Sequence, residues 1–112
     1  MITGIGVDIE SAQRFKESYQ DEHFINLIFT KQEIAYCNTK KEPYVSFAGK
    51  FCAKEAVIKA SEQKRNMKSI EILNDDSGKV KVSIDGHENK HIFCSISHTS
   101  DYAVAFVIIN KS

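Results

Sequence analysis

Two carboxylates, Asp8 and Glu55, stand in surroundings that favour chemistry. Asp8 lies in a segment where Gly4 and Gly6 alternate with apolar residues, so in a strand its side chain would share a face that is otherwise bare backbone. Glu55 lies in a segment that is apolar nearly all round when it is placed on a helix, which predicts a buried helix. Mg²⁺ commonly takes two carboxylates from a protein when phosphate supplies further ligands. These residues therefore indicate a metal–phosphate site.

The charges on the helix predicted around Glu55 have two explanations. Lys59 follows Glu55 by one turn, and a surface pair at this spacing stabilises a helix by about 0.2–0.5 kcal/mol. Alternatively, Glu55 binds a cation while the lysines of this helix bind anions, so that together they hold a metal–phosphate group. Asp8, as a second isolated carboxylate, favours the functional explanation.

His98 ends a strand-like segment rich in hydroxyl groups. Ser95, Ser97 and Thr99 surround it in sequence, and their hydroxyls suit phosphate oxygens. A lone histidine at such a position is more often structural than catalytic, so the segment alone is only suggestive.

Two other chemical signals are weak. His87-Glu88-Asn89-Lys90-His91 spells the H-E-x-x-H string of zinc metalloproteases, but it follows Asp85-Gly86 in a polar link between predicted strands, whereas the motif requires a helix. We predict a solvated loop there. The three cysteines are odd in number and far apart, which is typical of reduced core thiols in a cytosolic protein; they are Cys37, Cys52 and Cys94.

The elements that must position these residues follow from periodicity. Alternation predicts a strand over residues 2–10, and helices are predicted over residues 11–19, 30–37 and 43–61. The signals that open these helices are a serine N-cap, a capping box and a proline in the first turn, at Ser11, Thr30–Glu33 and Pro43. Two strand pairs follow, at residues 70–73 with 80–84 and at residues 92–98 with 102–109. This order predicts an α+β domain with an antiparallel sheet.

Length and composition narrow the possible classes of protein. The 112 residues suit one domain, residues 1–112, and 15 Lys+Arg balance 15 Asp+Glu. Zero net charge gives no reason to expect a nucleic acid or an anionic membrane as partner. No apolar run approaches the roughly 20 residues that span a bilayer, and the first residues do not resemble a signal peptide. We therefore expect a soluble cytoplasmic protein.

Three separated blocks resemble the holo-acyl-carrier-protein synthases of the small trimeric type. The blocks are GIGVDI at 4–9 with Arg14-Phe15, FAGKFCAKEA at 47–56 continuing to Lys59-Ala60, and SISHT at 95–99 with YAVA at 102–105. The resemblance implies the 4′-phosphopantetheinyl transferase fold, an antiparallel sheet packed against a long central helix. It also implies transfer of 4′-phosphopantetheine from coenzyme A to a serine of apo-acyl carrier protein, a cytoplasmic step of fatty acid biosynthesis that releases adenosine 3′,5′-bisphosphate.

The resemblance assigns roles to the candidate residues of the active site. It implies that Asp8 and Glu55 ligate Mg²⁺ and that Lys59 stabilises charge developing on the diphosphate of coenzyme A. It also implies that Lys50 and His98 contact phosphates of coenzyme A. Lys50 stands where relatives often have arginine, which keeps the charge but loses the bidentate fork.

The same resemblance implies partners. Arg14 and Lys16, on the first helix, would bind the acidic helix of the carrier protein. The family is homotrimeric, with coenzyme A bound between neighbouring subunits, and the apolar run at residues 102–109 agrees with this because a monomer would struggle to cover it. Relatives continue after the central helix into a glycine-rich loop, whereas Ser61–Asn66 contains no glycine.

Two points stay open in the sequence. The base that takes the serine proton is either Glu55 directly or a metal-bound water relayed through Asp8. Two other functions would also fit two carboxylates and a phosphate site. One is a catalytically silent oligomeric domain that holds a nucleotide-like ligand, and the other is a Mg²⁺-dependent phosphohydrolase.

Overall fold

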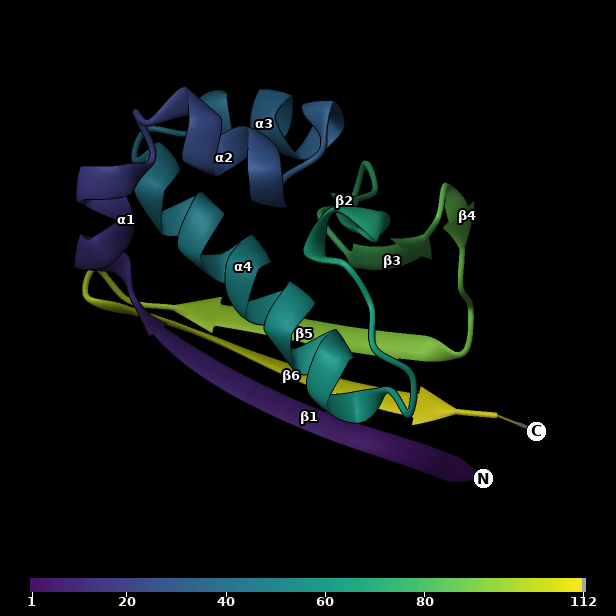
Figure 1. The fold of residues 1–112 in the computed structure, drawn as a ribbon. Helices are drawn as coiled ribbons and strands as arrows, with labels where there is room; N and C mark the ends of the chain where they lie inside the picture. The colour runs from purple at the N-terminus through teal and green to yellow at the C-terminus, as the bar shows by residue number, and fades with distance from the viewer. Residues whose placement is uncertain (112) are drawn as a thin grey trace.

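A long helix, α4, lies across a three-stranded sheet, and a smaller sheet and three short helices complete the fold (Figure 1). This computed structural model describes residues 1–111; Ser112, the last residue of the predicted domain, lies outside them. The elements are β1 Ile2–Ser11, α1 Ala12–Ser18, α2 Glu22–Ile28, α3 Lys31–Asn38, α4 Pro43–Ala60, the 3₁₀ turn η1 Met67–Ser69, β2 Ile70–Asn74, β3 Val80–Ile84, β4 His87–Glu88, β5 Ile92–His98 and β6 Tyr102–Asn110.

The strands pair antiparallel, as predicted, but they form two three-stranded sheets instead of the single sheet expected. The larger has the order β1-β6-β5, so the first strand of the chain pairs with the last and Asp8 lies opposite Ala105. The smaller has the order β2-β3-β4 and extends the predicted hairpin by the two-residue strand β4. Strand β4 includes His87 and Glu88, so the H-E-x-x-H string is not helical, and the prediction of a loop there was partly wrong.

Two local predictions need correction. A helix that the sequence patterns did not predict, α2, lies between the first and second predicted helices, and Asp21 caps it by accepting from the Phe24 N–H at 3.2 Å. Ser11 precedes α1 but its side chain makes no capping hydrogen bond. The capping box at Thr30 and Glu33 is confirmed, with both reciprocal hydrogen bonds present.

The glycines of β1 allow the strand to approach α4. A Cβ added at Gly6 would collide with the carbonyl oxygen of Ala56, and one added at Gly4 would collide with that of Ala60. The glycine face of the strand is therefore not an open surface, because it packs directly on the helix backbone. This close approach places Asp8, on the same face, beside the last turns of α4.

Lys54 of α4 is a structural residue. Its side chain is fully buried and forms an ion pair with the equally buried Glu33 at 2.7 Å. Its Nζ also donates to three backbone carbonyls, those of Ile28, Met67 and Ile70 at 2.8, 3.0 and 2.6 Å. A buried charge is tolerated only when it is paired and hydrogen-bonded. Lys54 thus ties α4 to α2, α3 and β2, and its partners are protein groups rather than a substrate anion.

The core lies mainly between α4 and the inner face of the larger sheet, with aromatic rings joining the short helices to it. Phe47 of α4 packs edge-on against Phe29, with ring centroids 5.0 Å apart. All three cysteines are unpaired; Cys37 and Cys52 are buried and Cys94 is half-buried. Among residues 1–111, every helix is too short or too polar to cross a bilayer.

Candidate active site

Asp8 and Lys59 meet where the end of α4 crosses β1. The Lys59 Nζ donates to Asp8 Oδ1 and to the Val7 carbonyl, both at 3.0 Å. The hydrogen bond to Asp8 raises the pKa of Lys59, so the lysine stays protonated. The surface pair between Glu55 and Lys59 that the spacing allows is not among the ion pairs within residues 1–111, because Lys59 reaches across to the strand instead.

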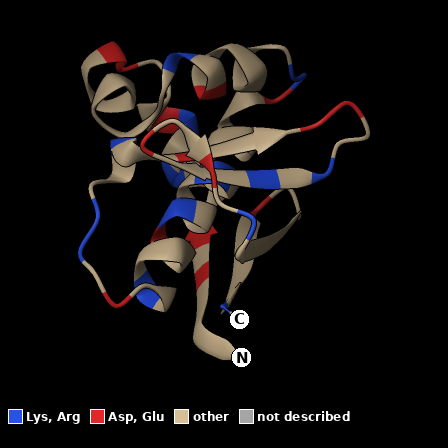
Figure 2. Cartoon of the chain, turned by 90° about the vertical axis from the view of Figure 1, so that its right-hand side faces the viewer, with Lys and Arg blue, Asp and Glu red and all other residues tan. Residues whose placement is uncertain are grey.

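Glu55 contributes a second carboxylate on the same side of the helix. It stands one turn before Lys59, and its negative charge acts on both Lys59 and the β1 residue Glu10. In Figure 2 the acidic bands of β1 lie beside the charged last turns of α4. The fold therefore brings Asp8 to Glu55 and Lys59, which lie about fifty residues later in the sequence.

The free oxygen of Asp8 fits a cation. Asp8 Oδ2 is buried and has no hydrogen-bond partner in the described part of the chain. A buried carboxylate oxygen without a partner is costly, and a metal ion would satisfy it. Residues 1–111 contain no group of three or more His, Cys, Asp and Glu that could hold a metal by themselves. Two carboxylates suit Mg²⁺, because this ion usually keeps most of its coordination positions for substrate oxygens and water.

Glu10 also belongs to this site, although the sequence analysis gave it no role. Its side chain is only 15% exposed and forms an ion pair with Arg14 Nη1 at 3.2 Å. Burial, followed by a side-chain hydrogen bond with Asp8, raises the pKa of Glu10. Two signals in the sequence could have indicated it: the two-residue spacing from Asp8 along a strand, and the four-residue spacing to Arg14.

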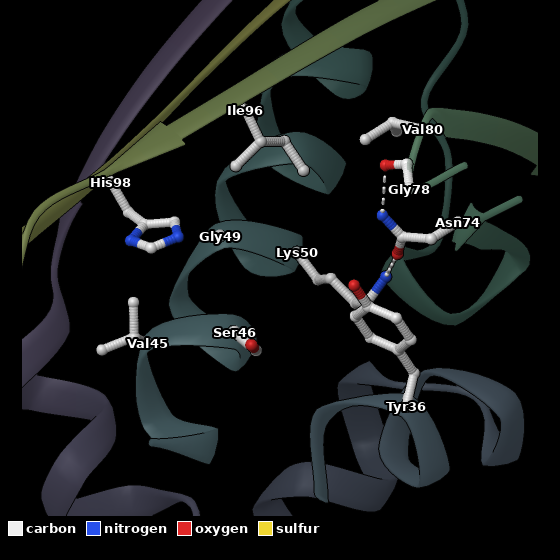
Figure 3. Close-up of a pocket in the computed structure, with 10 residues that line it drawn as sticks. All are labelled: Tyr36, Val45, Ser46, Gly49, Lys50, Asn74, Gly78, Val80, Ile96 and His98. Atoms are coloured by element: carbon white, nitrogen blue, oxygen red, sulfur yellow. Dashed lines mark hydrogen bonds between the residues drawn. The ribbon is translucent and has the colours of Figure 1, made fainter. Parts of the chain in front are cut away.

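Lys50 and His98 line a different cavity, of about 190 Å³, between α4, β5 and the β2–β3 hairpin (Figure 3). Lys50 is buried and donates to the Ile72 carbonyl at 2.6 Å and to Asn74 Oδ1 at 2.8 Å. Its Nζ also lies 4.5 Å from the centre of the Tyr36 ring. Burial lowers the pKa of Lys50. The predicted pair of residues therefore shares one cavity, although Lys50 already has protein partners.

A second cavity, of about 500 Å³, adjoins the first and shares His98 with it. Its polar lining also includes three residues that were not predicted to bind phosphate, namely Lys40, Ser46 and Ser100. Thr99 also lines it, as its place beside His98 suggested. Ser95 and Ser97 do not accompany His98: strand alternation turns them to the outer face of β5, with the exposed Phe93.

The two groups of candidate residues lie on different sides of α4. Lys50 and Glu55 are separated by five residues, which turns their side chains about 140° apart on a helix. The cavities lined by His98 have no contribution from Asp8, Glu55 or Lys59. Within one chain, therefore, the carboxylates and the His98 cavities do not form a single pocket.

The remaining predicted residues, Arg14 and Lys16, lie on α1 directly after β1. The Arg14 side chain is 75% exposed, and its contact with Glu10 connects it to the carboxylates. The Lys16 Nζ lies 5.7 Å from the centre of the Tyr44 ring. Both basic groups are exposed; Arg14 lies beside the Asp8 site, whereas Lys16 lies near the start of α4.

The outer face of the larger sheet is apolar and exposed. The side chains that make it so alternate with the inward-facing residues of β1, β5 and β6. They are Ile5, Val7, Ile9, Phe93, Tyr102 and Phe106, each 45–63% exposed. An apolar face of this extent is typical of an interface.

Comparison with known proteins agrees with the fold and the resemblance. The sequence model of the 4′-phosphopantetheinyl transferase superfamily matches residues 4–107. The holo-[acyl-carrier-protein] synthase of Thermodesulfovibrio yellowstonii is 45% identical over 113 residues, which cover 97% of this chain and 99% of that protein. The corresponding protein of Chloroherpeton thalassium is 38% identical, with 94% and 95% covered.

Comparison with solved structures supports the same family. A holo-(acyl-carrier-protein) synthase from Bacillus anthracis, in complex with CoA (3′,5′-ADP), superposes with a TM-score of 0.85 at 33% identity and covers 100% of this chain and 99% of that one. The holo-[acyl-carrier-protein] synthase of Neisseria meningitidis also has a TM-score of 0.85, at 26% identity, with 99% and 100% covered. The α+β fold and the family resemblance predicted from the three sequence blocks are confirmed. The chain belongs to the 4′-phosphopantetheinyl transferase superfamily, among its holo-acyl-carrier-protein synthases.

Proposed function

We propose that this chain transfers 4′-phosphopantetheine from coenzyme A to a serine of an apo-acyl carrier protein, with Mg²⁺ held by Asp8 and Glu55. Family membership supports the reaction. The observation that carries the metal assignment is Asp8 itself: one carboxylate oxygen is held by Lys59, and the other is buried without a partner.

The chemistry requires charge neutralisation and positioning more than covalent help from the protein. The serine Oγ attacks the phosphorus that bears the pantetheine, the bond from that phosphorus to the bridging diphosphate oxygen breaks, and adenosine 3′,5′-bisphosphate leaves. When bound, Mg²⁺ neutralises the diphosphate oxygens. Lys59, held protonated beside Asp8, would stabilise the charge that develops there. The serine proton passes either to Glu55 directly or to Asp8 through a water.

Coenzyme A would bind between neighbouring subunits of a homotrimer. Two observations support this part of the proposal: the carboxylates and the His98 cavities lie on different sides of α4, and the outer face of the larger sheet is exposed and apolar. A neighbour packed on that face would bring the two halves of the site together. Lys50 and His98 would then contact phosphates of coenzyme A from across the interface.

The carrier protein would dock on α1 through Arg14 and Lys16. Helix α1 begins where β1 ends, so a carrier held there would present its serine near Asp8. Basic groups at a rim steer an acidic partner and fix its orientation. The same proposal has the chain act as a single domain over residues 1–112, in the cytoplasm and without nucleic acid.

One experiment tests the activity against the two alternatives. The protein is incubated with coenzyme A, Mg²⁺ and an apo-carrier protein, and the carrier is then weighed by mass spectrometry. A gain of one phosphopantetheine supports the transferase. Coenzyme A binding without transfer would identify a silent domain, and cleavage of coenzyme A without a carrier would identify a hydrolase.

A further inference from the structure

Four charged groups form a continuous row along the inner edge of β1. Arg14 Nη1 lies 3.2 Å from Glu10 Oε1, Glu10 stands two residues after Asp8 on the same face of the strand, and Asp8 Oδ1 lies 3.0 Å from Lys59 Nζ. The two ends of this row are exposed, Arg14 by 75% and Lys59 by 52%, whereas the two carboxylates are 15% and 11% exposed. The row runs from the proposed carrier surface to the proposed metal site.

Glu10 is the carboxylate of the row that lies between the two regions. Its carboxylate is attracted by Arg14, with which it forms an ion pair, and is repelled by the like charge of Asp8 two residues away. Because Arg14 is largely exposed, its pair with Glu10 is weak and exchangeable. An acidic group on a docking carrier would compete with Glu10 for the same guanidinium.

We propose that Glu10 is a positioning residue that couples carrier docking to metal binding, a role that rests on the proposed function. Without the carrier, Arg14 compensates the charge of Glu10. When a carboxylate of the carrier pairs with Arg14 in place of Glu10, Arg14 no longer compensates the negative charge of Glu10. That charge then helps to attract a cation to the nearby Asp8. Conversely, a cation bound at Asp8 draws Glu10 toward it and releases Arg14 for the carrier.

The coupling is reciprocal, so it can be measured from the carrier side. The probe is an apo-carrier protein whose acceptor serine is replaced by alanine, labelled for fluorescence anisotropy, with no coenzyme A present. Its Kd is measured without divalent cation and with saturating Mg²⁺. In the wild type, Mg²⁺ should tighten carrier binding by about two- to fivefold, the range that exchange of one exposed ion pair allows.

Two variants separate coupling from a merely structural role. Glu10→Gln should bind the carrier more tightly than the wild type in the absence of Mg²⁺, because Arg14 is already free, and Mg²⁺ should then change the Kd little. Glu17→Gln, which removes a negative charge from the exposed surface of α1 without a contact to Arg14, should respond to Mg²⁺ as the wild type does.

The outcomes are distinct. Equal Mg²⁺ responses in the wild type and Glu10→Gln would overturn the role of Glu10. A wild type that transfers phosphopantetheine but binds the carrier equally with and without Mg²⁺ would overturn the coupling and leave the proposed function standing. Failure to bind the carrier under any condition would overturn both.

Discussion

At the scale of single residues, the two oxygens of Asp8 have opposite surroundings. Oδ1 accepts from Lys59, whereas Oδ2 is buried with no partner among residues 1–111. An isolated carboxylate would gain from satisfying both oxygens within the protein. Leaving one free inside a crowded site is a cost that a bound cation would remove, which is why Asp8 carries the metal proposal.

The proposal that Asp8 and Glu55 share one metal ion makes a prediction about paired substitutions. Asp8→Ala and Glu55→Ala should each lower kcat/KM by about 10²-fold or more, a loss typical of removing one electrostatic group from a transition state. The double variant should be little worse than either single variant, because residues that act as a unit are not additive. Circular dichroism would confirm that each variant folds. Two losses that multiply in the double variant would count against a shared ion.

Burial of the cysteines makes a prediction about pH. Burial raises the pKa of Cys37 and of Cys52 to about 12, and that of Cys94 to about 11. Because the thiolate is the reactive form, a raised pKa keeps these thiols protonated at pH values where an ordinary cysteine ionises. Alkylation by iodoacetamide between pH 7 and pH 9 should therefore stay slow in the native protein. In denaturant all three should react; fast labelling of Cys37 in the folded protein would contradict its burial.

At the scale of elements, β1 and α4 act as one unit. The strand carries Asp8 and Glu10 and the helix carries Glu55 and Lys59, so the site exists only where the two backbones touch. The glycines of β1 make that contact possible, since a side chain at Gly6 would meet the carbonyl of Ala56. Backbone cannot move aside as a flexible side chain can.

Substitution at the strand–helix contact should therefore be damaging. Gly6→Ala should destabilise the protein by about 1–3 kcal/mol or more, the usual cost of overpacking, and should lower transfer because Asp8 moves away from α4. Gly49→Ala is a matched control: its Cβ would lie 3.2 Å from the Ile96 Cγ2 side-chain atom, and alanine suits a helix better than glycine. Urea unfolding measures both. A Gly6→Ala protein as stable as the wild type would show that the strand can separate from the helix freely.

Helix α1 gives a prediction about the carrier. Arg14→Glu should raise the KM for the carrier protein and flatten its salt dependence, because it reverses an exposed charge at the rim of the site. The KM for coenzyme A should barely change. Steady-state kinetics with each substrate varied in turn distinguishes the two. Equal damage to both values would show that Arg14 is structural or belongs to the coenzyme site.

The sequence predicts individual helices and strands better than it predicts which distant residues contact one another after folding. Strand alternation and capping signals are local, so β1, the α3 capping box and both hairpins were predictable from a few residues each. The partner of Lys54 was not, because Glu33 lies 21 residues earlier and meets it only after folding. Glu10 differs from Lys54, because its spacings to Asp8 and Arg14 are local signals; what the sequence does not reveal is that its side chain is only 15% exposed after folding.

At the scale of the whole molecule, one chain does not bring all the candidate site residues into a single pocket. Asp8 and Glu55 are on one side of α4, and the cavities lined by His98 are on another. The first-to-last pairing of β1 with β6 leaves one face of the sheet packed on α4 and the other face bare. A monomer with so much exposed apolar surface would be prone to association, whereas a trimer would cover it and complete the site at once.

A charge placed on the bare face should separate the subunits. Phe106 lies on this face of β6 and is 45% exposed, whereas its neighbours Ala105 and Val107 point into the core. Phe106→Glu should therefore fold, sediment as a smaller species and lose transfer activity although Asp8 and Glu55 remain intact, because in the proposed trimer each site needs two chains. Phe106→Leu keeps the position apolar and should stay trimeric and active. Analytical ultracentrifugation and the carrier mass assay report both properties, and a folded Phe106→Glu monomer with full activity would overturn the shared site.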